Sequence, residues 1–249
     1  MTYKIIESPQ NPMIKELALL KQTASRKNYG QILIESLHPV EEAIHSGLEI
    51  DHVLVRQDRA DAVLKLLPSL AEEPIIVSEA AMARIATTDS APEVLAIAQH
   101  PKILKILPDT TTLGLWNIQD PGNVGTLIRS ALAFGIQSIG LLGPSGVDAY
   151  HPKVIRSSAG LIFRAQIYQA ETLDTTMPVI ALDAKSTITM SDFNWPEKAL
   201  ILLGSEGAGL PHALPSTAQT ISIPMTTDAE SLNVAIAGSI VLSHRYLQK

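Results

Sequence analysis

The chain has 249 residues, a formal net charge of −6, 46% hydrophobic residues and 18% charged residues. This length and balance predict a globular protein with one large or two medium domains, each able to bury its own core. The acidic balance excludes a protein that holds nucleic acid by overall attraction, so contacts with phosphates must come from local basic groups.

Several further classes are excluded by what the sequence lacks. It contains no cysteine, which rules out disulfides, zinc sites built on cysteine and thiol catalysis. Its histidines follow no metal-ligand spacing, so we expect no metal site. No apolar run approaches the roughly 18 residues of a membrane span, and the first residues lack the apolar centre of a secretory signal. We therefore expect a cytoplasmic protein without membrane contact.

The first hundred residues alternate short predicted helices and strands. A helix is expected over 9–24, with Asn11 as N-cap and Pro12 in the first turn. The other expected segments are helices over 39–47, 61–67 and 79–86 and strands over 31–36, 52–55, 74–78 and 93–99. This alternation predicts an α/β domain over residues 1–100, with a parallel or mixed sheet.

Residues 101–111 carry prolines and threonines around a short apolar patch and form the expected linker. Residues 112–249 resume the alternation and are expected to form a second α/β domain. The expected strands cover 112–118, 138–142, 165–168, 178–182, 200–203 and 220–223, and the expected helices cover 123–134, 153–160 and 231–246. Apolar runs this short are typical of buried parallel strands.

The joint between the strand 112–118 and the next helix is rich in glycine. Its glycines allow a tight turn and expose backbone N–H groups at a helix N-terminus, which suits a polar or anionic ligand. Asn123 lies in this turn, although the same pattern also serves as a plain structural joint. Arg129 follows six residues later among apolar positions, so we expect it to project toward a cleft or a partner subunit.

Two later loops carry polar groups. Glu206 lies among Gly204, Gly207 and Gly209, whose spacing differs from the dinucleotide fingerprint; its carboxylate either serves a site or stabilises the turn. Ser231 is the expected N-cap of the final helix. That helix is apolar on nearly all sides, which predicts burial within the domain or at a subunit interface.

Three blocks resemble the signature motifs of the SpoU (TrmH-like) family of RNA ribose 2′-O-methyltransferases, of the SPOUT class. The blocks are DPGNVGTLIRSALAFG (120–135), LLGSEGAGLP (202–211) and ISIPM with SLNVAIAGSIVLSHR (221–225 and 231–245). The resemblance implies a SPOUT α/β catalytic domain with a trefoil knot, S-adenosylmethionine as cofactor, an RNA substrate and a homodimer formed through the C-terminal domain.

The N-terminal half resembles the family's small ribosomal-protein-like α/β substrate-binding domain, in the stretches 7–20 and 32–44. The family usually has glycine after the glutamate of the second stretch, where this chain has Ser36. A positive φ is therefore not expected at Ser36.

Three groups of side chains are candidates for the site, the first two by their match to the family and the third by a local basic stretch and a weaker match at 151–160. The catalytic group is Asn123, Arg129, Glu206, Ser231 and Asn233. The cofactor-binding group is Leu182, Gly204, Ile223, Pro224, Met225 and Leu232. The RNA-binding group is Lys15, Lys21, Arg26, Lys27, Arg156 and Ser157, although the first four also suit a solvated face and the last two a capped surface helix.

The implied reaction moves a methyl group from a sulfonium to a ribose hydroxyl, so the protein must align the reactants and help remove the hydroxyl proton. We expect Arg129 to stabilise the developing alkoxide, because a guanidinium with a pKa above about 12 is a poor base. The proton acceptor is either Glu206 or an RNA phosphate. Ribosomal RNA is favoured over tRNA as the substrate.

Two other classes of protein are alternatives for this sequence. A non-catalytic RNA-binding or ribosome-assembly protein could keep the same fold, but it would not need the set Asn123, Arg129, Glu206 and Asn233. A nucleotide-binding oxidoreductase of the Rossmann type is disfavoured because G-x-G-x-x-G follows the first strand of neither half.

Overall fold

The computed structural model divides the chain into two compact units. The residues it describes are 3–67, 73–207, 209–226 and 231–248. The first unit combines Met1–Pro101 with Tyr150–Phe163, and the second combines Lys102–Ala149 with Arg164–Lys249. The chain therefore passes between the units three times, and residues 150–163 pack with the first unit although they follow the linker in sequence.

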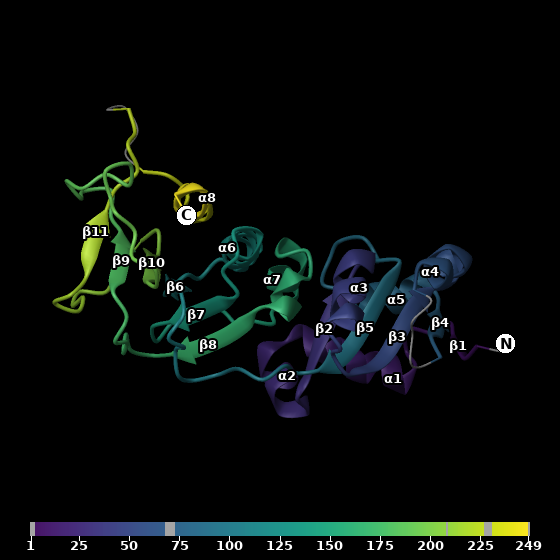
Figure 1. Ribbon diagram of the computed structural model, residues 1–249. Helices are drawn as coiled ribbons and strands as arrows, with labels where there is room; N and C mark the ends of the chain where they lie inside the picture. The colour runs from purple at the N-terminus through teal and green to yellow at the C-terminus, as the bar shows by residue number, and fades with distance from the viewer. Residues whose placement is uncertain (1–2, 68–72, 208, 227–230, 249) are drawn as a thin grey trace. The chain divides into compact units, whose positions relative to one another are not determined.

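A mixed sheet of five strands forms the centre of the first unit. Its strands are β1 (Ile5–Ile6), β2 (Gln31–Glu35), β3 (Ile50–Arg56), β4 (Ile75–Val77) and β5 (Val94–Gln99). They lie in the order β1-β4-β3-β5-β2 (Figure 1). β1, β4 and β3 are parallel, and β5 is antiparallel to both of its neighbours. The four predicted strands are confirmed, whereas the sequence pattern did not indicate β1.

Short helices surround this sheet. They are α1 (Pro12–Leu17), α2 (Thr23–Tyr29), α3 (Leu37–His45), α4 (Ala60–Leu66), α5 (Glu79–Ile85) and α7 (Pro152–Ser157), with 3-10 turns η1 (Ala18–Lys21), η2 (Gln57–Arg59) and η3 (Leu161–Arg164). Apolar side chains of α1 and α5, such as Ile14 and Met82, share one buried cluster with Leu33, Leu54 and Leu95 of the strands. These contacts hold one face of the sheet.

The predicted helix 9–24 is interrupted in the structure. Asn11 caps its start as expected, but at Gln22 the backbone becomes extended, with φ −90° and ψ 134°, and α2 begins at the next residue. The carbonyls at the end of η1 accept hydrogen bonds of 2.9 and 3.0 Å from the guanidinium of Arg26. The prediction was wrong because apolar periodicity does not reveal a side chain that satisfies the carbonyls of a broken helix.

The expectation for Ser36 was also wrong, because this residue has φ 79° and ψ 153°. Its amide donates to the Val94 carbonyl at 3.1 Å, and its carbonyl accepts from the Val40 amide at 3.2 Å. The backbone is thus held by β5 on one side and by the first turn of α3 on the other. These bonds require a conformation that glycine adopts far more readily than serine.

We expect Ser36→Gly to raise the free energy of unfolding by about 1 kcal/mol, because removing Cβ relieves the steric strain at this φ. Ser36→Ala is the control, since it keeps Cβ and the Ser36 hydroxyl makes no capping hydrogen bond to α3. Urea denaturation of both variants measures the effect, and a less stable glycine variant would contradict the strain argument.

The segment containing α7 is bound to the first unit by charge and by close packing. The buried carboxylate of Glu35 pairs with Arg156 and accepts a hydrogen bond of 2.6 Å from the Thr87 hydroxyl. Gly160 has φ +77°, and a Cβ at this position would lie 2.7 Å from the Cα of Pro39. These contacts explain why residues 150–163 belong to the first unit.

The second unit is built on a parallel sheet of six strands. They are β6 (Thr112–Trp116), β7 (Ser138–Leu142), β8 (Gln166–Ala170), β9 (Val179–Leu182), β10 (Leu200–Gly204) and β11 (Gln219–Ile221). The order is β11-β9-β10-β6-β7-β8, and every neighbouring pair is parallel. All six predicted strands of this half are confirmed, with shifts at their ends.

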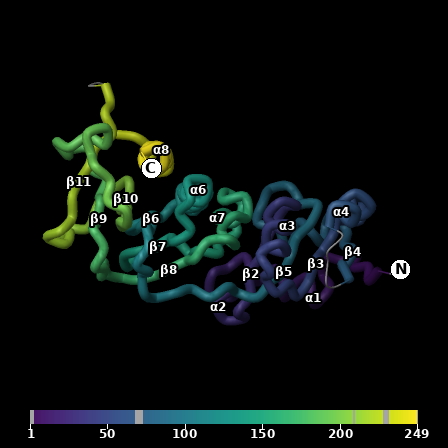
Figure 2. Tube along the Cα trace, viewed as in Figure 1, coloured from purple at the N-terminus to yellow at the C-terminus, as the bar shows by residue number. Residues whose placement is uncertain are grey.

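Two long helices of the second unit, α6 (Pro121–Ala133) and α8 (Val234–Leu247), lie side by side. Figure 2 shows the chain running through β11 and then returning to place α8 next to α6. Gly238 permits the close approach, because a Cβ there would lie 2.4 Å from Leu127 of α6. The hydroxyls of Ser130 and Ser239 meet at 2.7 Å across the contact. In the described residues, no helix has the length and hydropathy that crossing a membrane requires.

Candidate active site

Four adjacent strands of the second sheet, β11, β9, β10 and β6, point their carboxyl ends toward the same edge because they are parallel. Loops at such an edge are the usual position of binding sites in open α/β sheets. Asn123 follows β6, Glu206 follows β10 and Ile223 follows β11. The strand order therefore brings together side chains that lie up to a hundred residues apart.

Asn123, Glu206 and Asn233 form one hydrogen-bonded network. The Glu206 Oε1 atom accepts from the Asn233 Nδ2 at 2.8 Å and from the Asn123 Nδ2 at 3.2 Å. The Asn233 Nδ2 also donates to the Asn123 Oδ1 at 3.2 Å. Each of the three side chains contacts the other two, so the orientation of the carboxylate is fixed by two amides.

Asn233 also caps α8. Its Oδ1 accepts from the amides of Ala235 and Ile236 at 3.0 and 3.3 Å. Ser231 was predicted as this cap, and the prediction was wrong, because the helix begins two residues further on, where Asn233 can satisfy its first free N–H groups. Ser231 instead lines a neighbouring pocket.

That pocket has a volume of about 330 Å³ and contains most of the predicted cofactor-binding group. It is lined by Leu182, Asp183, Ala184, Leu203, Gly204, Ser205, Glu206, Gly209, Leu210, Ile223, Met225, Ser231, Leu232, Val234 and Ala237. We call it the β9–β11 pocket. Pro224 is exposed and is not among the described lining residues, since neighbouring side chains of an extended segment point to opposite sides.

The glycine loop at one wall of this pocket folds back on itself. Ser205 and Gly209 exchange backbone hydrogen bonds of 2.9 and 3.2 Å. A Cβ on Gly204 would lie 2.4 Å from the carbonyl carbon of Gly209, so only glycine fits there. The close turn presents Glu206 at its tip.

A second cavity, of about 350 Å³, also borders Glu206. It is lined by Ile118, Gln119, Asp120, Asn123, Ser205, Glu206, Gly207 and Val234. Glu206, Ser205 and Val234 line both cavities. We call this second space the β6–β10 cavity. A group bound in either space would therefore face the same carboxylate.

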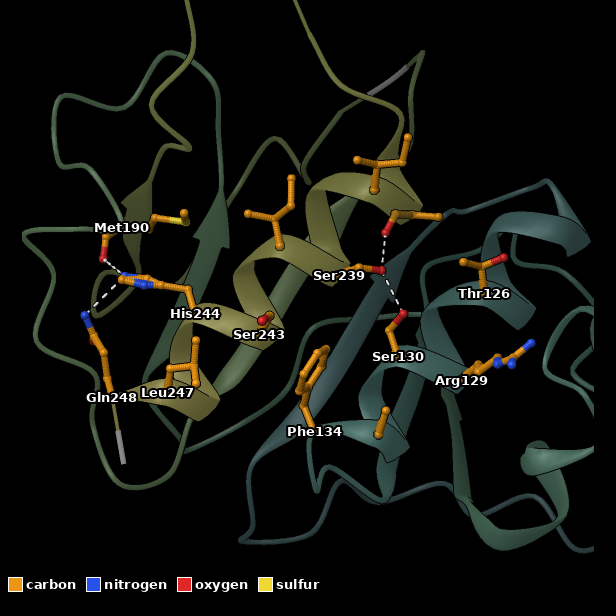
Figure 3. Close-up of a pocket in the computed structure, with 14 residues that line it drawn as sticks. Thr126, Arg129, Ser130, Phe134, Met190, Ser239, Ser243, His244, Leu247 and Gln248 are labelled. Atoms are coloured by element: carbon orange, nitrogen blue, oxygen red, sulfur yellow. Dashed lines mark hydrogen bonds between the residues drawn. The ribbon is translucent and has the colours of Figure 1, made fainter.

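Arg129 lies apart from both cavities. It lines a groove of about 950 Å³ between α6 and α8, together with Thr126, Ser130 and residues of α8. Figure 3 shows its side chain extending away from α8, whereas Ser130 points to Ser239. Six residues of helix turn through about 600°, so Arg129 and Asn123 are on different faces of α6. Arg129 was expected to project toward a cleft or a partner subunit, and among the described residues it lines the α6–α8 groove and neither of the two cavities at Glu206.

The predicted RNA-binding residues divide into two groups. Lys15, Lys21 and Lys27 are exposed at the surface. The pKa of Lys21 is lowered from its ordinary value, because partial loss of hydration outweighs the opposing effect of the Glu35 carboxylate. Arg26 is fully buried and donates to the Thr23 hydroxyl at 2.8 Å. The expectation that Arg26 contacts RNA is therefore corrected: its guanidinium satisfies carbonyls inside the first unit.

The other predicted pair, Arg156 and Ser157, belongs to the first unit through α7. The Arg156 side chain is 27% exposed and its Nη1 atom is bound to Glu35 and Thr87. Ser157 is partly exposed. In the parts of the chain that the structure describes, no three His, Cys, Asp or Glu residues are grouped to hold a metal ion.

Sequence reasoning missed several lining residues, including Asp183, Ser205 and Gln119. Each follows a predicted strand directly or within a few residues. The position alone was a usable signal, because the carboxyl ends of parallel strands form the binding edge. The resemblance did not single these positions out.

Comparison with known protein families gives two matches, one in each half of the chain. The SpoU rRNA Methylase family matches residues 110–243, and the MRM3-like substrate binding domain matches residues 11–96. Together the two matches contain the predicted catalytic, cofactor-binding and RNA-binding residues.

Individual relatives match over nearly their whole length. An uncharacterized tRNA/rRNA methyltransferase from Synechocystis is 33% identical over 95% of this chain and 91% of its own. The 23S rRNA (guanosine(2553)-2′-O)-methyltransferase RlmP of Bacillus subtilis is 30% identical over 97% of this chain and 98% of its own. The solved SpoU methyltransferase AviRb from Streptomyces viridochromogenes, in complex with the cofactor AdoMet, has a TM-score of 0.84 and 25% identity, covering 96% of this chain and 98% of its own.

The parallel sheet, the cavities at its carboxyl edge and these matches define an RNA methyltransferase with a separate substrate-binding domain. The chain belongs to the SpoU rRNA Methylase family.

Asn233 both caps α8 and donates to Glu206, and a substitution can separate these two roles. Asn233→Asp keeps an oxygen that caps α8, but it replaces the donor to Glu206 by a second carboxylate oxygen. We expect methylation to fall by at least about a hundredfold, because the two carboxylates repel each other and Glu206 loses its orientation.

Thermal unfolding provides the control for this variant, since an intact cap keeps the melting temperature within a few degrees of wild type. Asn233→Ala loses the cap as well and should be less stable. Normal turnover in the aspartate variant would show that the network does not serve the reaction.

Proposed function

We propose that the β9–β11 pocket and the β6–β10 cavity together form the active site of an S-adenosylmethionine-dependent RNA ribose 2′-O-methyltransferase, with the cofactor in the first and the target nucleotide in the second. The observation that carries this proposal is the network of Asn123, Glu206 and Asn233, which lies where the two spaces meet. Radiolabelled methyl transfer to rRNA and tRNA, followed by mass-spectrometric mapping, tests it.

The β9–β11 pocket suits this cofactor. Leu182, Leu203, Ile223 and Leu232 give it apolar walls for an adenine ring. Glu206 and Asp183 supply negative charge for a cationic ligand. S-adenosylmethionine supplies an activated methyl group when it is bound, so the chain itself must align the hydroxyl and remove its proton.

Glu206 is the proposed proton acceptor. Its Oε1 is held by two amides, whereas no hydrogen bond to its Oε2 is found among the described residues. The carboxylate is therefore held through one oxygen, and the residue lines both cavities. An RNA phosphate is the second candidate for this role, as the sequence analysis left open.

Arg129 is proposed to act in the site of a second copy of the chain. It lies on an exposed face of α6, and no hydrogen bond or ion pair to it is found among the described residues. The α6–α8 groove exposes apolar Ile236 and Leu247, which are 54% and 79% exposed. An apolar groove of this kind fits a symmetric interface between two copies. A guanidinium delivered across it would stabilise charge that develops on the ribose oxygen.

We expect Arg129→Ala to lower methylation by at least about a hundredfold while S-adenosylmethionine still binds. Mixing inactive Arg129→Ala with inactive Glu206→Gln then tests the shared site. If the arginine acts across the interface, random re-association restores about a quarter of the sites, because each mixed dimer regains one complete site. A mixture without recovered activity, in mixed dimers shown to form, would place both residues in one chain.

RNA selection is assigned to the first unit, and ribosomal RNA is the proposed substrate because RlmP, which aligns along nearly the whole chain, is named for 23S rRNA. The exposed lysines Lys15, Lys21 and Lys27 are its proposed phosphate contacts. Local charge has to carry the binding, because the whole chain has a net charge of −6.

Changing Lys15, Lys21 and Lys27 together to Gln should weaken RNA binding by about tenfold or more and reduce its salt dependence by up to about three units of slope. Affinity for S-adenosylmethionine should not change. Lys65→Gln, in the same domain but outside this stretch, is the control. Equal loss of RNA and cofactor binding would argue against the division of labour.

The proposal also covers the domain boundaries, the knot and the location of the enzyme. We keep 1–100, 101–111 and 112–249 as the domains and linker of the sequence, with residues 150–163 packed on the first unit. A trefoil knot is proposed because the resemblance to the SPOUT class implies it, and α8 packs against β10 and α6. A cytoplasmic location is proposed, because the relatives are RNA-modifying enzymes.

The alternative weighed in the sequence, a non-catalytic RNA-binding protein with this fold, is disfavoured. It would not need the oriented carboxylate of Glu206, and RlmP, which matches over nearly its full length, is named as a methyltransferase. Calorimetric titration with S-adenosylmethionine separates the two, because only the enzyme requires it.

A further inference from the structure

The β9–β11 pocket is acidic. Its described lining residues include two carboxylates, Asp183 and Glu206, and no lysine, arginine or histidine. Glu206 is bound by two amides and has a proposed part in the reaction. Asp183 directly follows β9, and no part in the reaction has been proposed for it.

The fold requires an oxygen atom at Asp183 but not its charge. The Oδ1 atom accepts from the Lys185 amide at 2.9 Å, which closes a turn that asparagine would also close. The Asp183 amide donates to the Ile221 carbonyl at 2.9 Å, a bond that any residue except proline would make. No lysine or arginine forms an ion pair with Asp183 in the described residues. The negative charge therefore remains available to a ligand in the pocket.

The charge of the ligand changes during the reaction. S-adenosylmethionine carries a sulfonium cation, whereas S-adenosylhomocysteine, the product, has a neutral thioether at the same place. The amino and carboxylate groups of the two molecules are alike. A carboxylate in the pocket wall therefore attracts the substrate form more strongly than the product form.

We propose that Asp183 is a specificity-determining residue that makes the pocket favour the cationic cofactor over its neutral product. This inference rests on the proposed assignment of the β9–β11 pocket to the cofactor. It gives the charge of Asp183 a function in exchanging spent for fresh cofactor. The partly exposed position of Asp183 limits the effect to about three- to tenfold in relative affinity, because water and salt screen the charge.

The test is the Asp183→Asn variant of the full chain, titrated by calorimetry with three ligands. They are S-adenosylmethionine, S-adenosylhomocysteine and sinefungin, which carries a protonated amine in place of the sulfonium. We expect the affinities for S-adenosylmethionine and sinefungin to fall about three- to tenfold and that for S-adenosylhomocysteine to stay unchanged. The preference of the wild type for the cations should also weaken as salt is raised.

Asp174→Asn is the matched control. It removes the same charge from an exposed position of the same unit that does not line the pocket. We expect all three affinities to stay at wild-type values in this variant. An equal change in both variants would mean that net charge, and not Asp183, sets the preference.

Two other results would overturn the inference. An equal loss for all three ligands would show that Asp183 contacts a part that they share, and unchanged affinities would show that its charge is not felt. Asparagine keeps the Oδ1 acceptor, so an unchanged melting temperature confirms that the turn is intact. Failure of the proposed function is distinguishable, because wild-type protein would then bind none of the three ligands.

Discussion

The side chain of Asn233 joins the stability of the second unit to its chemistry. One amide satisfies the first N–H groups of α8 through its oxygen and orients Glu206 and Asn123 through its nitrogen. The start of α8 and the orientation of the site residues therefore depend on the same side chain. Any movement of the first turn of α8 changes the direction of the carboxylate, so the close packing of α8 on α6 at Gly238 also holds the site.

The parallel sheet explains why the site is where it is. Strands β11, β9, β10 and β6 are neighbours, so the loops that follow them meet at one edge although they are far apart in sequence. One pocket forms beyond β9, β10 and β11, and a second cavity forms beyond β10 and β6. Glu206 follows β10, the strand common to both. This position suits a residue that has to act between a methyl donor and a hydroxyl acceptor.

The charged residues of the chain also differ in role according to where they lie. The chain is acidic overall, the exposed lysines at 15, 21 and 27 form one short basic stretch, and two carboxylates line the β9–β11 pocket. Buried charges serve the fold instead. Glu35 and Arg156 fasten α7 to the first unit, and Arg26 satisfies carbonyls at a helix break. Whether a basic side chain is accessible to RNA therefore depends on its position in the fold.

The sequence by itself determined the class of fold, every strand except β1, and the loops that carry the candidate site residues. Apolar runs and glycine-bearing loops are patterns of neighbouring residues. The strands β6 to β11 and the loop positions of Asn123, Gly204 and Glu206 could therefore be predicted from the sequence. Only the tertiary structure decided matters that depend on distant partners. The positive φ of Ser36 follows from hydrogen bonds with Val94 and Val40, and the burial of Arg26 follows from a break that periodicity cannot show. The separation of Arg129 from the pocket follows from the face of α6 that carries it, because a motif fixes spacing along the chain but not the direction of a side chain in space.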